Sequence, residues 1–194
     1  IEKHDGRLNT VAELDPSAPE QARKLDAAGQ NRALPLFGLP VLVKDNIDVK
    51  GLHTTAGSLS LADNVAAEDA PVIANLRRNG AVILGKTNMT EFANYTSPDM
   101  PNGYSSRGGQ VIGAFDPAMD PGGSSTGSAV AVSAGFCAAA VGTDTSFSIV
   151  GCATQNGVTG LKPAHGSLPG KGIIPISHTL DSAGPLTRDA ADAW

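Results

Sequence analysis

Short apolar runs alternate with helix-forming segments in the first half of the chain, and this alternation constrains the fold more than any other feature. Residues 40–44 and 81–85 are apolar runs of the length of buried strands. Between them, residues 69–80 predict a helix with Asp69 as its N-cap, Pro71 in its first turn and Gly80 at its end. Strands and helices that alternate in this way are typical of α/β layering. We therefore expect an α/β fold.

The same signals predict further elements on both sides of this unit. Residues 17–28 predict a helix that Ser17 caps and Gly29 ends. The stretch 97–123 is rich in Gly, Pro, Asp, Ser and Asn, and we expect a long loop with a functional role. The remaining predictions are a helix over 87–95 capped by Thr87, a buried helix over 129–137, a strand over 138–141, and short apolar pieces at 158–163 and 172–176.

Composition limits the classes of protein to which the chain can belong. With 194 residues it is long enough for one domain with a substantial core, and short for two. An apolar content of 41% and a charged content of 17% are typical of a folded globular protein. The net charge of −5, without a cluster of Lys or Arg, argues against a nucleic-acid partner. No segment approaches the ~20 apolar residues of a membrane span, so a membrane partner is not expected either.

Cysteine usage and the two ends of the chain bear on its compartment and completeness. Cys137 and Cys152 match neither a disulfide framework nor a metal-ligand spacing, so we expect no metal and a reducing, cytoplasmic location. Residues 1–5 do not form a signal peptide, although the chain begins without Met, which leaves export open. A helix predicted to start at Thr187 stops within about two turns. We therefore expect residues 1–194 to be a single domain that is incomplete at its C-terminus.

Two serines and one lysine are the candidates for chemistry. Ser124 lies in a Gly-Gly-Ser-Ser-Thr-Gly segment, Ser148 follows a Gly-Thr-Asp-Thr segment, and Lys44 ends the first apolar run. A serine hydroxyl is a poor nucleophile near neutral pH and needs a base within hydrogen-bond reach. A lysine can be that base only when it is neutral, and burial lowers its pKa toward that state. The combination indicates acyl transfer, although Lys44 taken alone is more typical of a solvated surface charge.

A second arrangement uses some of the same residues. Residues 123–127 match G-x-S-x-G, the nucleophile elbow of α/β-hydrolases, and Asp144, His165 and His178 follow in the order of a Ser-Asp-His triad. The elbow requires a strand directly before its serine, whereas residues 116–121 include two prolines and cannot form a central strand. A flexible Gly/Ser linker is disfavoured because an apolar helix follows at once. A phosphate-binding loop is disfavoured because no lysine follows the glycines.

Five sequence blocks follow one another in order: Lys44-Asp45-Asn46, Gly85-Lys86-Thr87-Asn88-Met89, Gly122-Gly123-Ser124-Ser125-Thr126-Gly127-Ser128-Ala129, Asp144-Thr145 with Ser148-Ile149, and Gly157-Val158 with Gly160-Leu161-Lys162-Pro163. Together they resemble the amidase signature family. The stretch Arg107-Gly108-Gly109-Gln110 and the run Ile149-Val150 resemble its bacterial peptide-amidase branch most closely. The resemblance implies a mixed sheet surrounded by helices, of which this chain would be an N-terminal portion. It also implies an amidohydrolase that acts on a small-molecule amide and releases ammonia or an amine.

The resemblance assigns roles to the candidate residues. Ser148 would be the nucleophile, Ser124 a bridging serine after a cis peptide bond, and Lys44 a buried base within hydrogen-bond reach of Ser124. The backbone N–H groups of Thr145, Ser146, Phe147 and Ser148 would form the oxyanion hole. No metal or organic cofactor is implied. An incomplete sheet would leave an unpaired edge and an exposed apolar face, so we expect that the chain can associate with copies of itself.

The sequence departs from the family pattern beside the nucleophile, which keeps two other interpretations open. Ser146 and Phe147 replace a usual Gly-Gly, and Phe147 would be strained if its position required a positive φ. Val150 and Cys152 stand where many members have Arg and Pro. The glutamine-hydrolysing subunit of glutamyl-tRNA amidotransferase is the first alternative, and Val150 argues against it. The second is a binding module that keeps the fold without turnover.

Overall fold

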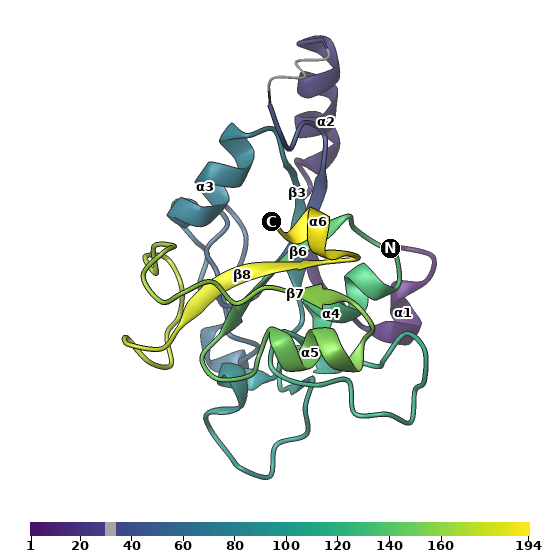
Figure 1. Ribbon diagram of the computed structural model, residues 1–194, viewed down its shortest axis with the longest axis vertical. Helices are drawn as coiled ribbons and strands as arrows, with labels where there is room; N and C mark the ends of the chain where they lie inside the picture. Colours follow the sequence, from purple (N-terminus) through teal and green to yellow (C-terminus); the bar gives the residue numbers. More distant parts are fainter. Residues whose placement is uncertain (30–33) are drawn as a thin grey trace.

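The computed structural model describes residues 1–29 and 34–194, and a mixed six-stranded sheet lies at its centre (Figure 1). The strand order is β1-β3-β2-β6-β8-β7. The adjacent strands β3, β2 and β6 are parallel, whereas β1 runs antiparallel to β3, and β8 runs antiparallel to β6 and β7. The bounds are β1 (Val11–Leu14), β2 (Pro40–Lys44), β3 (Val82–Thr87), β6 (Ala139–Asp144), β7 (Thr159–Gly160) and β8 (Ser182–Thr187). The predicted α/β class with a mixed sheet is confirmed.

Helices cover both faces of this sheet, as Figure 1 shows with α3 on one side of the strands and α4 and α5 on the other. Ile73 of α3 packs against Val41, Val43 and Ile83 on the first face. The second face packs Leu42 and Ala140 against α4 and α5. The remaining elements complete the chain: α1 (Asp5–Leu8), α2 (Ala18–Ala27), α3 (Pro71–Arg78), the hairpin β4 (Tyr104–Ser105) and β5 (Gly109–Gln110), α4 (Thr126–Ser133), α5 (Val150–Gln155) and α6 (Ala190–Ala193).

The parallel strands end at one edge of the sheet, and this edge gathers the polar candidates. Lys44, Thr87 and Asp144 are the last residues of β2, β3 and β6, respectively. Ligand sites of α/β sheets lie outside the carboxyl ends of their strands. The candidate chemistry therefore lies where the architecture favours a site.

The predicted cap Ser17 is right in position only, and the predicted cap Asp69 is wrong. Ser17 is the N-cap residue of α2, which begins at Ala18, but its hydroxyl donates to Asp15 Oδ1 at 2.7 Å and accepts no N–H of the helix. α3 begins at Pro71, and its N-cap residue is Ala70. The Asp69 carboxylate pairs instead with the guanidinium of Arg77 at 3.0 Å. Gly29 and Gly80 follow these helices with positive φ values of 75° and 94°, as their predicted role at helix ends requires.

The predicted helix over 87–95 is also wrong. Thr87 extends β3, where it pairs with β1 and β2, so it cannot cap a helix. The segment η2 (Glu91–Asn94) is a short turn in which Phe92, Ala93 and Asn94 have φ values of 43°, 54° and 69°. Left-handed conformations of this kind are rare for residues other than glycine, and propensity rules cannot predict three in succession.

The later elements differ from their predictions mainly in their bounds. The buried helix is found as α4, but it starts three residues before the predicted position, directly after Ser125, and Gly135 with φ 73° follows its end. The strand predicted at 138–141 continues to Asp144 as part of β6. The stretch 97–123 contains only the two-residue strands β4 and β5, in agreement with the predicted loop. β1, α5 and β8 were not predicted.

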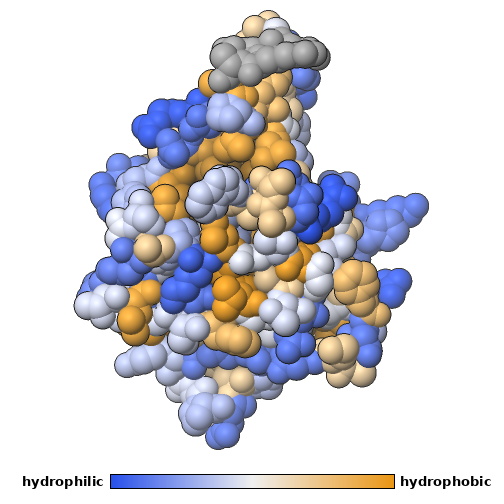
Figure 2. All heavy atoms as spheres, in the orientation of Figure 1, coloured by the Kyte–Doolittle hydropathy of each residue, from blue (hydrophilic) through white to orange (hydrophobic). Residues whose placement is uncertain are grey.

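The surface of the molecule is uneven in polarity. Figure 2 shows apolar residues running through the middle of one face toward α2, with hydrophilic residues along its margins. Exposed large apolar side chains of the C-terminal half include Phe147, Val150, Leu168 and Leu180. In the described ranges, no helix combines the length and the apolar character needed to cross a membrane.

Candidate active site

Lys44 is completely buried at the end of β2, and its amino group is surrounded by neutral oxygens. Its Nζ atom lies 2.7 Å from Ser124 Oγ and 3.0 Å from Ser125 Oγ. Thr143 contributes its Oγ1 at 2.8 Å and its carbonyl oxygen at 3.3 Å. The prediction that Lys44 is buried within hydrogen-bond reach of Ser124 is confirmed.

The surroundings of Lys44 favour its neutral form. Burial lowers the pKa of Lys44 to about 7, and the opposing effects of Cys152, Asp144 and Asp181 are smaller. Burial also raises the pKa of Cys152 to about 12, so this thiol is uncharged near neutral pH. Within residues 1–29 and 34–194, no carboxylate forms an ion pair with Lys44. A lysine in this setting can accept a proton near pH 7.

The Gly122–Ser125 segment brings the two serines to Lys44 from the loop before α4. The Gly123–Ser124 peptide bond is cis, as expected from the family resemblance. An added Cβ at position 123 would overlap the side-chain oxygens of Asn94 and Asn102, so these side chains would have to move to admit any other residue. Ser124 and Ser125 are both fully buried. The tight packing holds the 122–125 loop against Lys44.

Ser148 lies on the loop between β6 and α5, and it is more accessible than the other candidates. Lys44 and Ser124 are fully buried, whereas Ser148 is half-buried. Its carbonyl oxygen accepts a hydrogen bond from the N–H of Ser125 at 3.2 Å, which joins the two serine loops. The buried Lys44, the buried Ser124 and the accessible hydroxyl of Ser148 therefore lie in neighbouring segments.

Asp144 and Lys162 hold the Ser148 loop at both ends. Asp144 Oδ2 accepts from the N–H groups of Ile149 at 2.7 Å and Val150 at 3.2 Å. Lys162 Nζ donates to the Thr145 carbonyl at 2.6 Å and lies 3.1 Å from Asp144 Oδ1. In the part of the chain that the structure describes, the N–H groups of residues 145–148 donate to no other protein group. Free N–H groups on a fixed loop are what an oxyanion hole requires.

Phe147 adopts an unstrained backbone conformation beside Ser148. It is absent from the residues with positive φ, so the strain considered for this position does not arise. Its ring is 58% exposed and covers Gly151, where an added Cβ would overlap the ring carbons. Phe147 and Val150 thus present an apolar rim next to the accessible hydroxyl.

Two cavities reach the polar network around Lys44. One of about 320 Å³ is lined by Thr143, Ser182 and the two histidines of the C-terminal loops, His165 and His178. The other, of about 200 Å³, has mainly apolar walls that include Met89, Phe92 and Ile176, together with the polar Asn46. Asn46 Nδ2 donates to Thr143 Oγ1 at 3.0 Å, and Thr143 contacts Lys44. Both cavities therefore adjoin the hydrogen bonds around Lys44.

The nucleophile-elbow arrangement does not form. Ser124 follows a loop and not a strand, and Asp144 is engaged by the N–H groups of α5 and by Lys162. His165 Nδ1 lies 3.0 Å from the carbonyl oxygen of Asp181, and neither His165 nor His178 forms a hydrogen bond with Ser124 in the described residues. Over the same ranges, no cluster of His, Cys, Asp and Glu is arranged to hold a metal ion.

Sequence reasoning did not predict several residues that shape the site. Thr143 and Ser125 contact Lys44 directly, and Lys162 and Asp181 hold the Ser148 loop or its neighbours. Ser125 and Lys162 lie inside blocks that carried the family resemblance, which was the available signal. Thr143 and Asp181 have no signal in the sequence, because their contacts depend on the pairing of β6 with β8.

A sequence model of the amidase family matches residues 1–194, the whole chain. The chain belongs to the amidase family. The resemblance read from the five sequence blocks is thereby confirmed.

Individual relatives agree with this assignment. A probable amidase of Arabidopsis thaliana is 42% identical over 198 residues, which cover 100% of this chain and 39% of that protein. A glutamyl-tRNA(Gln) amidotransferase subunit of Nitratidesulfovibrio vulgaris is 44% identical, again over 100% of this chain and 39% of its own length. The crystal structure of native peptide amidase from Stenotrophomonas maltophilia superposes with a TM-score of 0.94 at 45% identity, and the match covers 99% of this chain and 40% of that one. The chain spans about two fifths of the length of these amidase-family relatives.

Proposed function

We propose that this chain carries the reacting groups of an amidohydrolase, with Ser148 as nucleophile, Ser124 as the bridging serine and Lys44 as the base. The observation that carries the proposal is the fully buried Lys44, whose Nζ lies 2.7 Å from Ser124 Oγ without any carboxylate partner in the described chain. A lysine placed in this way is suited to proton transfer and not to an ion pair.

The hydrogen bonds around Lys44 support its role as an acceptor. The Ser125 hydroxyl donates to the Thr143 carbonyl at 3.0 Å, so its oxygen can only accept from Lys44. Thr143 Oγ1 accepts from Asn46 and lies within reach of a second N–H of Lys44. A neutral amine has two N–H groups and one lone pair. With both N–H groups directed at Ser125 and Thr143, the lone pair is left for the hydroxyl proton of Ser124.

The reaction then proceeds by a relay of proton transfers and one covalent intermediate. Lys44 accepts the proton of Ser124, which accepts the proton of Ser148, and Ser148 Oγ attacks the amide carbonyl. The N–H groups of residues 145–148 stabilise the oxyanion of the tetrahedral intermediate. Ser124 returns a proton to the departing nitrogen, which leaves as ammonia or an amine. Lys44 returns its proton to Ser124 at the same time. Water then attacks the acyl-enzyme and gives a proton to the same relay, the ester bond to Ser148 breaks, Ser148 Oγ takes the proton back, and the carboxylic acid leaves.

Labelling with a serine-directed acylating probe tests the proposal. Intact mass should show one adduct, and peptide mapping should place it on Ser148. Ser148→Ala should abolish the adduct, whereas Ser167→Ala, at an exposed serine of the C-terminal loops, should leave it unchanged. An adduct on Ser124 or Ser125 would contradict the assignment, and no adduct on a folded protein that also lacks turnover would favour a non-catalytic binding module.

Glutamine hydrolysis within a tRNA amidotransferase is the second candidate, because a protein named as part of such an enzyme is 44% identical to this chain. Val150 argues against it, since the residue two positions after the nucleophile is typically Arg in that group. Steady-state rates with glutamine and with amides that lack the α-amino acid group separate the two. A preference for glutamine that increases in the presence of charged tRNA would favour the amidotransferase role.

A further inference from the structure

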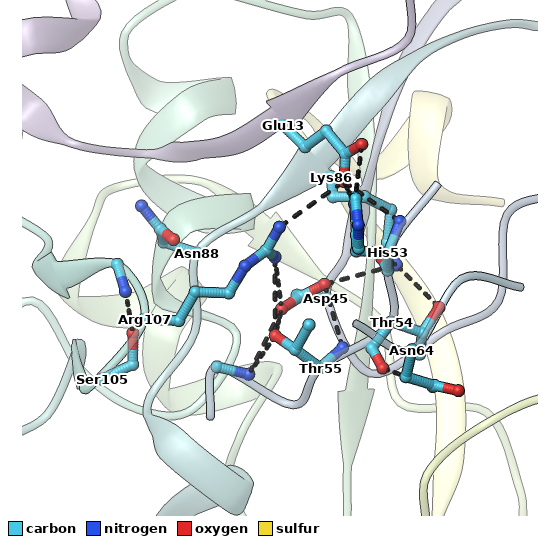
Figure 3. A network of polar contacts seen from close by, with 12 residues as sticks. Glu13, Asp45, His53, Thr54, Thr55, Asn64, Lys86, Asn88, Ser105 and Arg107 are labelled. Atoms are coloured by element: carbon cyan, nitrogen blue, oxygen red, sulfur yellow. Dashed lines mark hydrogen bonds and ion pairs between the residues drawn. The ribbon is translucent and has the colours of Figure 1, made fainter. Parts of the chain in front are cut away.

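A second buried lysine, Lys86, lies on β3 next to the strand of Lys44. In the parallel pairing of β2 and β3, Lys86 is opposite Val43, and Lys44 is opposite Thr87. Side chains alternate between the two faces along a strand, so the two lysines leave opposite faces of the sheet. Lys44 reaches the serine loops before α4, whereas Lys86 points into a group of charged residues that Figure 3 shows from close by. We call this group, Glu13, Asp45, His53, Lys86 and Arg107, the Asp45 cluster.

The carboxylate of Asp45 is fully engaged within this cluster. It is 1% exposed and lies 3.5 Å from Lys86 Nζ and 3.1 Å from Arg107 Nη1. It also accepts from the Thr55 hydroxyl and from the N–H of Gly57 at 3.3 Å (Figure 3). Although Asp45 follows Lys44 directly in the sequence, all these partners are residues other than Lys44.

Further contacts fix the two cations. Lys86 Nζ donates to the His53 carbonyl at 2.7 Å and lies 3.2 Å from Thr54 Oγ1. Arg107 also lies 3.6 Å from Glu13 Oε2, and Glu13 accepts from the N–H of His53 at 3.0 Å. The cluster thus pairs the cations Lys86 and Arg107 with the carboxylates of Asp45 and Glu13. Asp45, the neighbour of Lys44 in the sequence, is held between both cations.

We propose that Lys86 and Arg107 are positioning residues that hold the Asp45 carboxylate on the far face of the sheet, so that Lys44 meets the serines without a counter-ion. This inference rests on the proposed function, in which Lys44 is the base. Lys86 also fastens the loop that carries His53 and Thr54, which follows the Lys44-Asp45-Asn46 turn. The cluster therefore acts on Lys44 through charge as well as through position.

The charges that face Lys44 determine the direction of the effect. Asp144 at the end of β6 and Asp181 before β8 favour the ammonium form of Lys44, and burial disfavours it more strongly. Cys152 of α5 is uncharged near neutral pH. Burial lowers the pKa of Lys86 to about 8, with Asp45 opposing the effect, so Lys86 is mainly a cation at the pH where Lys44 titrates. Removal of Lys86 takes away this buried positive charge on the strand next to that of Lys44 and leaves the Asp45 carboxylate with less compensation. Both changes favour protonated Lys44, so the pKa of Lys44 should increase.

The test measures the titration of Lys44 in the full-length protein, independently of turnover. Lysine side chains that carry labelled methyl groups or an isotope label at Cε are followed by NMR between pH 5 and 11. The signal of Lys44 is identified because it is absent in Lys44→Ala. Lys86→Met should move the midpoint upward by roughly one pH unit or more. Arg107→Gln should move it in the same direction. The pH below which kcat/KM decreases should increase by the same amount.

Two variants separate the electrostatic effect from a structural one. Asp45→Asn combined with Lys86→Met removes both charges, and should return the midpoint toward that of the parent protein. Arg23→Gln makes the same change of charge as Arg107→Gln, at an exposed ion pair with Glu20 on α2, and should leave the midpoint unchanged. A role confined to folding would lower the melting temperature without moving the midpoint.

Each outcome decides the inference. An unchanged or lower midpoint in folded Lys86→Met or Arg107→Gln overturns it. If Lys86→Met does not fold, Arg107→Gln decides, because the Arg107 side chain keeps 18% of its surface exposed whereas Lys86 is completely buried, and Gln retains a polar group beside Asp45. Loss of turnover in Lys44→Ala concerns the proposed function alone: the midpoint can shift as predicted even if Lys44 is not the base.

Discussion

Lys162 Nζ lies 3.1 Å from Asp144 Oδ1 and donates at the same time to the carbonyl oxygen of Thr145. Asp144 is completely buried, and its other oxygen accepts from the first N–H groups of α5. The pair therefore fixes the loop that carries Ser148 relative to β6 and to α5. The position of Ser148 therefore depends on this contact.

Lys162→Met should lower kcat about 10- to 100-fold, because a displacement of about 1 Å at a reacting group has an effect of that size. KM should change less, since Lys162 does not line either cavity. Lys171→Met is the matched control, because it breaks an ion pair with Glu68 in which both side chains are 72% exposed. Equal losses of kcat in the two variants would show that the Asp144 contact does not position the loop.

The rate of amide hydrolysis should depend on the protonation of Lys44. Because burial lowers its pKa to about 7, the neutral form accumulates above that pH, and kcat/KM should increase with pH and level off above about 7. Lys44→Ala should lose about 100- to 10,000-fold in kcat, the usual contribution of a general base. A midpoint near 10, or a profile that is flat from pH 5.5 to pH 9, would contradict a neutral Lys44.

The sequence predicted the parts of the fold that depend on local patterns. The apolar runs of β2 and β3, the buried character of α4 and the glycines after α2 and α3 are all local signals. β8 was missed because Gly184 and Pro185 interrupt its pattern, and its place beside β6 depends on a distant partner. The cap assigned to Asp69 failed because its carboxylate pairs with Arg77 and accepts from the distant N–H of Lys50, whereas Ser17 keeps the N-cap position and loses only the capping bond to Asp15.

The candidate site could be predicted only where a family resemblance linked distant segments. Lys44, Ser124 and Ser148 were assigned in this way, and Lys44 does lie next to Ser124. The Asp45 cluster draws on five separate parts of the chain, and no single window of sequence contains two of its cations. Ion-pair clusters of this kind become visible only when the strand register is known.

Lys44 should also make stability depend on pH, with a sign that follows from its pKa. The pKa is lower in the folded protein, about 7, than the ordinary value of 10.5, so the unfolded chain binds more protons between these values. The contribution of Lys44 to the free energy of unfolding therefore increases as the pH rises from about 7 to about 10.5 and decreases as the pH falls through this range.

The variant Lys44→Met removes this pH-dependent contribution. Its free energy of unfolding relative to the parent protein should be most favourable near pH 7 and least favourable near pH 10, as urea titrations at the two pH values would measure. An equal difference at both values would show that Lys44 is charged in the folded state.

Gly127→Ala should destabilise the fold and impair catalysis together, because Gly127 lies where α4 meets the end of β3. Its N–H donates to the Asn88 carbonyl at 3.0 Å, and an added Cβ would collide with the backbone oxygens of Asn88 and Thr10. Backbone atoms cannot turn aside as a side chain can, so α4 must shift as a whole. Overpacking of this kind costs about 1–3 kcal/mol in the free energy of unfolding. Since α4 begins directly after Ser125, the same shift should move Ser124 and Ser125 away from Lys44 and lower kcat.

Gly6→Ala is the control for Gly127→Ala, because an added Cβ at position 6 would meet nothing within 4 Å. Normal urea stability and kcat in Gly127→Ala would show that the contact between α4 and β3 is looser than these distances imply.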